Sequence, residues 1–145
     1  MNDSAGDPTG NLLSKVLLPV ANEADAEKSA RALKHYDPEH VVALHVVEKG
    51  EGVPDKTPVA QSEEIAEKSY AAVREIFPEA TDHTEYRRDV VEAIYEAAEE
   101  IDATSIAFRS RAGNRLLQFL SGDTTLRLVT NAPIPVISLP EESGE

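Results

Sequence analysis

Apolar runs alternate with amphipathic segments along this chain. Four runs, at 15–20, 40–47, 104–108 and 135–139, hold mostly apolar residues, which is typical of strands that are buried on both faces of a sheet. The stretch 83–88 takes a fifth strand position, although it is short and polar. Helical periodicity fills the intervals, so the pattern predicts the order β-α-β-α-β-α-β-α-β.

Each interval between the strands carries the signals of a helix. Asn22 is a predicted N-cap, and the positions after it that repeat at helical spacing are apolar: Ala26, Ala30 and Leu33. The segment 59–77 forms the longest predicted helix, and Asp89 starts a third helix with a pattern that resembles a capping box. For the last helix, the pattern predicts Asp123 or Thr124 as the cap.

This alternation predicts one α/β domain over residues 14–140, with a disordered tail at 1–13 and another tail at 141–145. Buried strands separated by helices pair in parallel, so helices cover both faces of a five-stranded, doubly wound, Rossmann-like sheet. We expect the strand order 3-2-1-4-5, with the first strand in the centre. Such sheets bind ligands at the carboxyl ends of the strands, where the order reverses. The loops after Val20 and Phe108 are therefore predicted to flank that crevice.

The composition excludes several classes of protein. With 27 Asp plus Glu against 14 Lys plus Arg, the net charge is −13, which repels nucleic acid. The chain has no cysteine, so disulfides, thiol catalysis and thiolate metal sites are excluded. No apolar run approaches the roughly 18 residues of a membrane span, and the first residues do not resemble a secretory signal. We therefore expect a soluble cytoplasmic protein.

The acidic balance also indicates the kind of host. A surface with many carboxylates and few lysines stays hydrated where salt screens ordinary charge repulsion. We therefore predict a salt-adapted host such as a halophilic archaeon. An ordinary acidic bacterial protein is the alternative.

Residue patterns of catalytic and metal sites are not found in the sequence. The four histidines, His35, His40, His45 and His83, lack the i, i+4 pairing of a helical zinc site, and we expect them to be ordinary surface or packed residues. The serines lack the G-x-S-x-G pattern of a nucleophile elbow. Glutamates on a helix face are normally just solvated. We therefore predict neither a metal site nor an enzyme.

Positive charge concentrates in one part of the chain. Residues 103–140 hold four arginines but one acidic residue. Arg109, Arg111 and Arg115 follow the fourth strand, where a doubly wound fold binds phosphate, so they are candidates for holding an anion. The alternative is that these arginines pair with the surrounding carboxylates, within the chain or across a dimer contact.

Taken in order, several segments resemble the universal stress protein family. They are KVLLPVANEADAEKSARAL, LHVVE, DVVEAIYEAAEEIDATSIAFRSRAG and LSGDTTLRLVTNAPIPVISLP. The resemblance extends from Lys15 to Leu139. It implies a homodimer that forms through the last strand, whose apolar edge is otherwise exposed, at Val136, Ile137, Ser138 and Leu139.

Nucleotide-binding members of that family carry two features from which this chain departs. The first is an aspartate just beyond the first strand, where Ala21 stands here. The second is a glycine motif after the fourth strand, where Arg109 and Ala112 replace the first two glycines. The motif ends in Gly122, followed by Asp123 in place of a hydroxyl residue. Arginine obstructs the approach of phosphate to the main chain that glycine allows, and a carboxylate repels phosphate.

By resemblance, ATP or AMP would contact a set of residues around the crevice: Pro19, Ala21, Val46, Phe108, Arg109, Ala112, Gly122, Asp123 and Thr124. The two departures predict that neither nucleotide binds tightly. The first hypothesis is therefore a non-enzymatic stress-response homodimer that acts through an unidentified protein partner. The second is a sensor of a nucleotide or another anion that uses the arginine-rich loop. A third is an ATPase, for which the residues supply no convincing base or metal ligand.

Overall fold

The computed structural model describes residues 12–48, 59–87, 89–109 and 122–140. Within these residues, five parallel strands form one sheet in the order β3-β2-β1-β4-β5, which confirms the predicted topology. The strands are β1 (Val16–Pro19), β2 (Val41–Glu48), β3 (Thr81–Arg87), β4 (Ser105–Arg109) and β5 (Val136–Leu139). The predicted tails at 1–11 and 141–145 lie outside the described residues.

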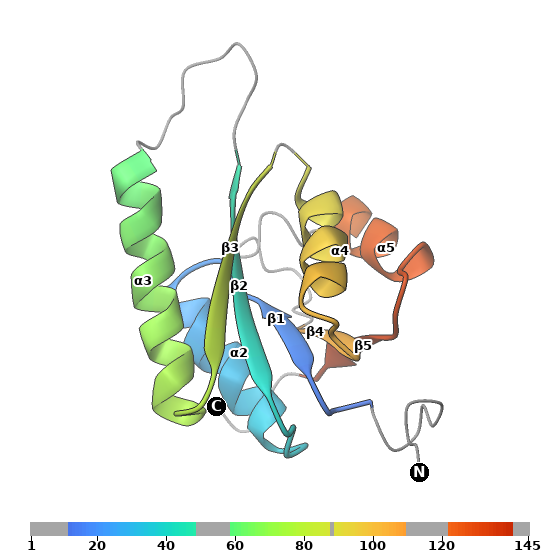
Figure 1. Ribbon diagram of the computed structural model, residues 1–145, viewed down its shortest axis with the longest axis horizontal. Helices are drawn as coiled ribbons and strands as arrows, with labels where there is room; N and C mark the ends of the chain where they lie inside the picture. Colours follow the sequence, from blue (N-terminus) through green and yellow to red (C-terminus); the bar gives the residue numbers. More distant parts are fainter. Residues whose placement is uncertain (1–11, 49–58, 88, 110–121, 141–145) are drawn as a thin grey trace.

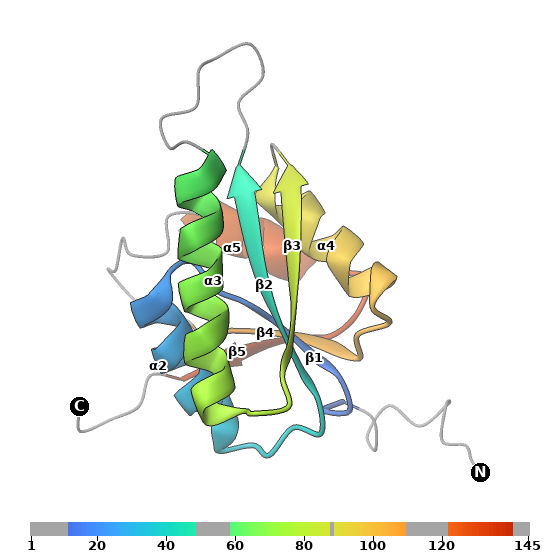
Figure 2. The ribbon, with the colours of Figure 1, turned by 60° about the vertical axis from the view of Figure 1, so that its left-hand side comes forward.

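Four described helices cover the two faces of the sheet. α2 (Glu23–Lys34) and α3 (Val59–Ile76) lie on one face, and α4 (Val90–Glu100) and α5 (Gly122–Thr130) lie on the other (Figures 1 and 2). This arrangement is the doubly wound, Rossmann-like architecture that the alternation of strands and helices predicts. α2, α3 and α5 each lead to the strand next to the preceding one, whereas α4 leads across the sheet to β4, which pairs with β1.

Two apolar clusters, one on each face, hold the helices to the sheet. β1 contributes to both, because Leu17 packs on the α4 side while Val16 and Leu18 pack on the α2 side. The predicted apolar stripe of α2 is confirmed, since its members are fully buried: Ala26, Ala30 and Leu33. A central strand buried on both faces therefore explains the continuous apolar run at the start of the sequence.

Two of the predicted helix caps are confirmed and one is wrong. The Asn22 side chain accepts a hydrogen bond from the Asp25 amide, and the Asp89 carboxylate accepts from the Val91 and Glu92 amides. α5 begins at Gly122, so the predicted caps at 123 and 124 lie inside its first turn. Residues 121–125 read Ser-Gly-Asp-Thr-Thr, and several of these types cap helices, so the sequence does not single out one of them.

Several element boundaries differ from the prediction. β3 begins at Thr81 and pairs along its whole length with β2, although its side chains are largely polar. The predicted N-terminal tail is too long, because the Leu12 and Leu13 carbonyls accept hydrogen bonds from Thr104 and Glu39. Leu13 also packs against the apolar cluster under α2. Among the described helices, none is long and apolar enough to cross a membrane.

Candidate functional site

The candidate site lies where the strand order reverses. β1 pairs with β2 on one side and with β4 on the other, so the chain leaves the centre of the sheet in two directions. The loop after β1 and the end of β4 therefore lie at the same, carboxyl edge of the sheet (Figure 2). This is the position at which doubly wound sheets bind ligands.

Several residues that the sequence analysis placed at the crevice come together here. Val46 and Phe108 are buried in the cluster on the α4 side, and Ala21 packs against the same cluster. Pro19 is buried at the end of β1. Gly122 opens α5, and Asp123 and Thr124 follow within the helix. Ala112, Arg111 and Arg115 lie outside the described residues.

Asp25 is the polar residue at this edge that the sequence analysis missed. It lies in the first turn of α2 and is 1% exposed. Its Oδ2 accepts a hydrogen bond from the Ala21 amide at 2.9 Å, and its Oδ1 accepts from the Ser29 hydroxyl at 3.2 Å. A signal was present, because Asp25 and Ser29 are four residues apart beside the apolar stripe of α2, where water-facing residues are not expected.

Arg109, the last residue of β4, completes this network. Its Nη2 donates to Asp25 Oδ1 at 3.1 Å, and the arginine is 3% exposed. Of the two expectations for Arg109, pairing with a carboxylate is therefore the one that the structure shows. The pair lies within one chain and joins α2 to β4 across 84 residues of sequence.

Burial makes this pair costly to break. Each charge loses its hydration, and the mutual attraction offsets that loss only where further hydrogen bonds satisfy the groups. The Asp25 carboxylate meets this condition with three donors: the Ala21 amide, the Ser29 hydroxyl and the Arg109 guanidinium. Because one of these donors is a backbone amide, the network also fixes the loop after β1.

His45 holds the same loop from the neighbouring strand β2. The ring lies on β2, is 8% exposed, and its Nδ1 is 3.1 Å from the carbonyl oxygen of Val20. Burial lowers the pKa of His45, which favours a neutral ring that donates from Nδ1 to this carbonyl. This histidine is therefore a packed structural residue, as the sequence predicted, and it holds the backbone directly after β1.

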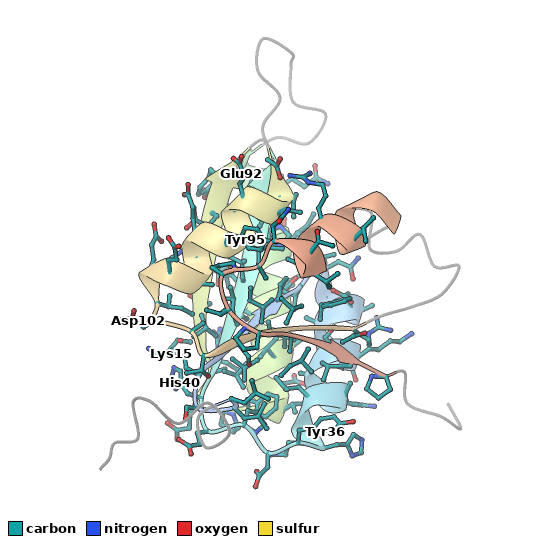
Figure 3. The ribbon with its side chains drawn as sticks, turned by 90° about the vertical axis from the view of Figure 1, so that its right-hand side faces the viewer. Lys15, Tyr36, His40, Glu92, Tyr95 and Asp102 are labelled. Carbon is teal, nitrogen blue, oxygen red and sulfur yellow. The ribbon has the colours of Figure 1, made fainter. Side chains whose placement is uncertain are left out.

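A second ion pair joins the two helices on the opposite face. Arg127 of α5 lies 2.7 Å from the Asp89 carboxylate, and this hydrogen bond lowers the pKa of Asp89. The Tyr95 hydroxyl on α4 lies 2.8 Å from the carbonyl oxygens of both Arg127 and Leu128, which share its one hydrogen. Figure 3 shows Tyr95 between α4 and α5. Arg127 is thus another arginine of the basic segment that pairs with a carboxylate.

One open hollow lies away from this edge. It lies between α3 and β3 and has a volume of about 370 Å³. Acidic side chains, Glu63, Glu64 and Glu67, line much of it, together with small residues and Tyr86. Tyr86 donates its hydroxyl to Glu63 at 3.0 Å. The hollow is therefore separate from the crevice at the carboxyl ends of β1 and β4.

Comparison with known proteins agrees with the fold and the order of the segments. The model of the universal stress protein family matches residues 13–140. The chain belongs to this family. A search of curated proteins finds no match.

Solved universal stress proteins share the fold at low sequence identity. One from Archaeoglobus fulgidus, in complex with dAMP, has a TM-score of 0.64 and 20% identity over 88% of this chain and 98% of that chain. One from Burkholderia pseudomallei has a TM-score of 0.62 and 20% identity over 89% and 97%. A third, in complex with cAMP, has a TM-score of 0.54 and 13% identity over 89% and 98%.

The buried pair makes a direct prediction for stability. Arg109→Met leaves the Asp25 carboxylate buried beside an apolar side chain, so we expect the free energy of unfolding to fall by about 3–5 kcal/mol. The double variant Asp25→Asn/Arg109→Met recovers much of this loss, because no buried charge remains. Urea unfolding followed by circular dichroism measures each value.

Arg74 supplies the matched control. It pairs with Asp82 at 2.9 Å, with side chains 40% and 44% exposed. We expect Arg74→Met to change the free energy of unfolding by less than about 1 kcal/mol, since water screens this pair. If Arg109→Met costs no more than Arg74→Met, the network around Asp25 does not hold α2 to β4.

Proposed function

We propose that this chain is a non-enzymatic universal stress protein of the cytoplasm. In this proposal it forms a homodimer, acts through protein partners and does not bind adenine nucleotides tightly. The observation that carries the proposal is the buried pair between Asp25 and Arg109 at the place where the strand order reverses. The pair places the Arg109 side chain at the end of β4, where a bound phosphate would need to approach the main chain without a side chain in the way.

The residues present do not fit a nucleotide phosphate. Close approach of phosphate to a strand end requires a residue without a side chain, and Arg109 places a β-carbon and a long side chain there. Ala21 stands where the resemblance calls for an aspartate, and its amide donates to Asp25. Asp123 is acidic where the resemblance calls for a hydroxyl residue. These three departures support weak binding or none.

Among the residues that the structure describes, the groups around the crevice also offer little for catalysis. A general base needs a lone pair that reaches the substrate, and the Asp25 carboxylate already accepts three hydrogen bonds while 1% exposed. His45 is buried and held by the Val20 carbonyl. This environment supports a binding or signalling role rather than hydrolysis.

A sensor of nucleotides or other anions is the second candidate. It is favoured by the basic character of residues 103–140 and by the relatives that were solved with dAMP and cAMP. Because Arg109 pairs with Asp25, such a sensor would rely on Arg111 and Arg115.

Calorimetric titration with ATP and Mg²⁺, and separately with AMP, distinguishes the two candidates. We expect no saturable heat and no rise in melting temperature at millimolar nucleotide for the wild type. Asp123→Ser alone gives the same result, because Ala21 and Arg109 remain. Tight binding that Arg111→Ala abolishes establishes the sensor instead, and restored binding in Asp123→Ser shows that the steric argument about Arg109 is wrong.

The homodimer rests on the edge of the sheet at β5. The Ile106 amide donates to the Pro135 carbonyl at 2.9 Å, and successive residues of a strand direct their backbone groups to alternate sides. Val136 and Ser138 therefore direct theirs away from β4, where a second chain can pair with them. Exposed apolar residues on the preceding helix, Leu126 and Val129, add to the surface that a partner would cover.

Ser138→Pro tests this interface because Ser138 is exposed and proline removes one outward amide while leaving the pairing with β4 intact. We expect the wild type to sediment at twice the chain mass of 15.7 kDa and Ser138→Pro to sediment as a monomer. Ser138→Ala is the control and stays dimeric. A wild type that sediments as a monomer contradicts the proposal.

Adaptation to salt is part of the same proposal. At a net charge of −13 the acidic groups of the folded chain repel one another. Salt weakens this repulsion, because the Debye screening length falls from about 30 Å at 0.01 M salt to about 3 Å at 1 M. We expect urea unfolding in KCl to show a higher free energy of unfolding at molar than at low salt. Salt also weakens the attraction within exposed ion pairs such as Arg31 with Glu27, which lowers the free energy of unfolding by a small amount. Equal stability in both salts contradicts the adaptation.

A further inference from the structure

Three potential metal ligands converge on the outer edge of the sheet, away from the crevice. His83 and Glu85 are two residues apart on β3, so their side chains lie on the same face of the strand. Glu100 is the last residue of α4, which packs against that face. His83 Nε2 lies 2.8 Å from Glu85 Oε2 and 3.2 Å from Glu100 Oε1. One ligand atom from each residue lies within 4.8 Å of the others.

These separations are near those of a metal coordination shell. Nitrogen and carboxylate ligands bind Zn²⁺ at about 2.0–2.2 Å, so neighbouring ligand atoms in a tetrahedral site lie roughly 3.3–3.6 Å apart. The 3.2 Å contact of His83 Nε2 with Glu100 is close to that range, and the 2.8 Å contact with Glu85 has to lengthen slightly to admit an ion. Two of the ligands come from a strand paired along its whole length, and the third comes from the end of a helix, so two rigid elements supply the site.

Two carboxylates share one ring nitrogen in this cluster. Glu85 and Glu100 both lie within hydrogen-bonding distance of His83 Nε2, which carries at most one hydrogen. Glu85 is the more buried of the two, with a side chain that is 9% exposed, so positive charge beside it is stabilising. A divalent ion between the three groups would use the nitrogen lone pair and neutralise both carboxylates together.

The end of α4 also favours a cation. The C-terminal end of a helix carries partial negative charge, which disfavours carboxylates such as Glu99 and Glu100. α4 has no basic residue in its own last turn. The Lys15 ammonium donates to the Ile101 carbonyl at 2.8 Å, so this end already attracts one positive group.

We infer that His83, Glu85 and Glu100 form a binding site for a divalent transition-metal ion, with Zn²⁺ as the representative. One imidazole with two carboxylates suits Zn²⁺ and its neighbours better than Mg²⁺, which prefers oxygen ligands and retains its water. Three protein ligands leave a further position for water. The bound ion joins the edge strand β3 to α4 and is independent of the function proposed for the crevice.

Titration of the EDTA-stripped full chain with ZnCl₂ by calorimetry tests the site. We expect one saturable site per chain and a rise in melting temperature, both unchanged by excess Mg²⁺. Glu100→Gln keeps the fold, because that side chain is 55% exposed. It lowers the affinity for Zn²⁺ by more than the roughly 10- to 100-fold that follows the loss of a group supporting a metal ligand. His83→Gln removes the saturable site.

Matched variants control for charge and for stray histidine binding. Glu99→Gln removes the same charge one residue away, and His35→Gln removes an exposed histidine at the end of α2. Both retain the wild-type affinity and the Zn²⁺-dependent rise in melting temperature. The inference is overturned if the wild type shows no saturable Zn²⁺ binding, or if Glu100→Gln and Glu99→Gln bind Zn²⁺ equally.

Discussion

A buried carboxylate must accept hydrogen bonds from neighbouring donors, and Asp25 imposes this constraint on the centre of the fold. The residue lies at the start of α2, beneath the point where the strand order reverses. Its partners come from the loop after β1, from the next turn of α2 and from the end of β4. The three elements that would form a ligand site are therefore tied to one another.

In our proposal, this constraint explains how a universal stress protein retains its architecture while its crevice differs from that of the nucleotide-binding members. Strand order and the two apolar clusters depend on the alternation of elements and not on the residue at the end of β4. Arg109 can therefore replace a small residue if a carboxylate comes with it, and Asp25 supplies that carboxylate. In our proposal, function then moves from the crevice to the surfaces that meet other proteins.

The sequence predicts the features that depend on local patterns. Continuous apolar runs identified the buried strands, and the caps at Asn22 and Asp89 marked two helix starts. It did not predict the pairing of Asp25 with Arg109, because 84 residues separate them and the pairing depends on how the helices fold back on the sheet. The sequence did not predict the cluster at His83 for the same reason, since Glu100 comes from a different element and the three residues have no helical spacing.

A crystal soaked in ATP and Mg²⁺ examines the crevice most directly. The account predicts that the end of β4 carries no nucleotide and that Arg109 Nη2 stays within hydrogen-bonding distance of the Asp25 carboxylate. A fully occupied triphosphate beside Pro19 and Phe108, with the Arg109 side chain turned away from α2, would contradict it.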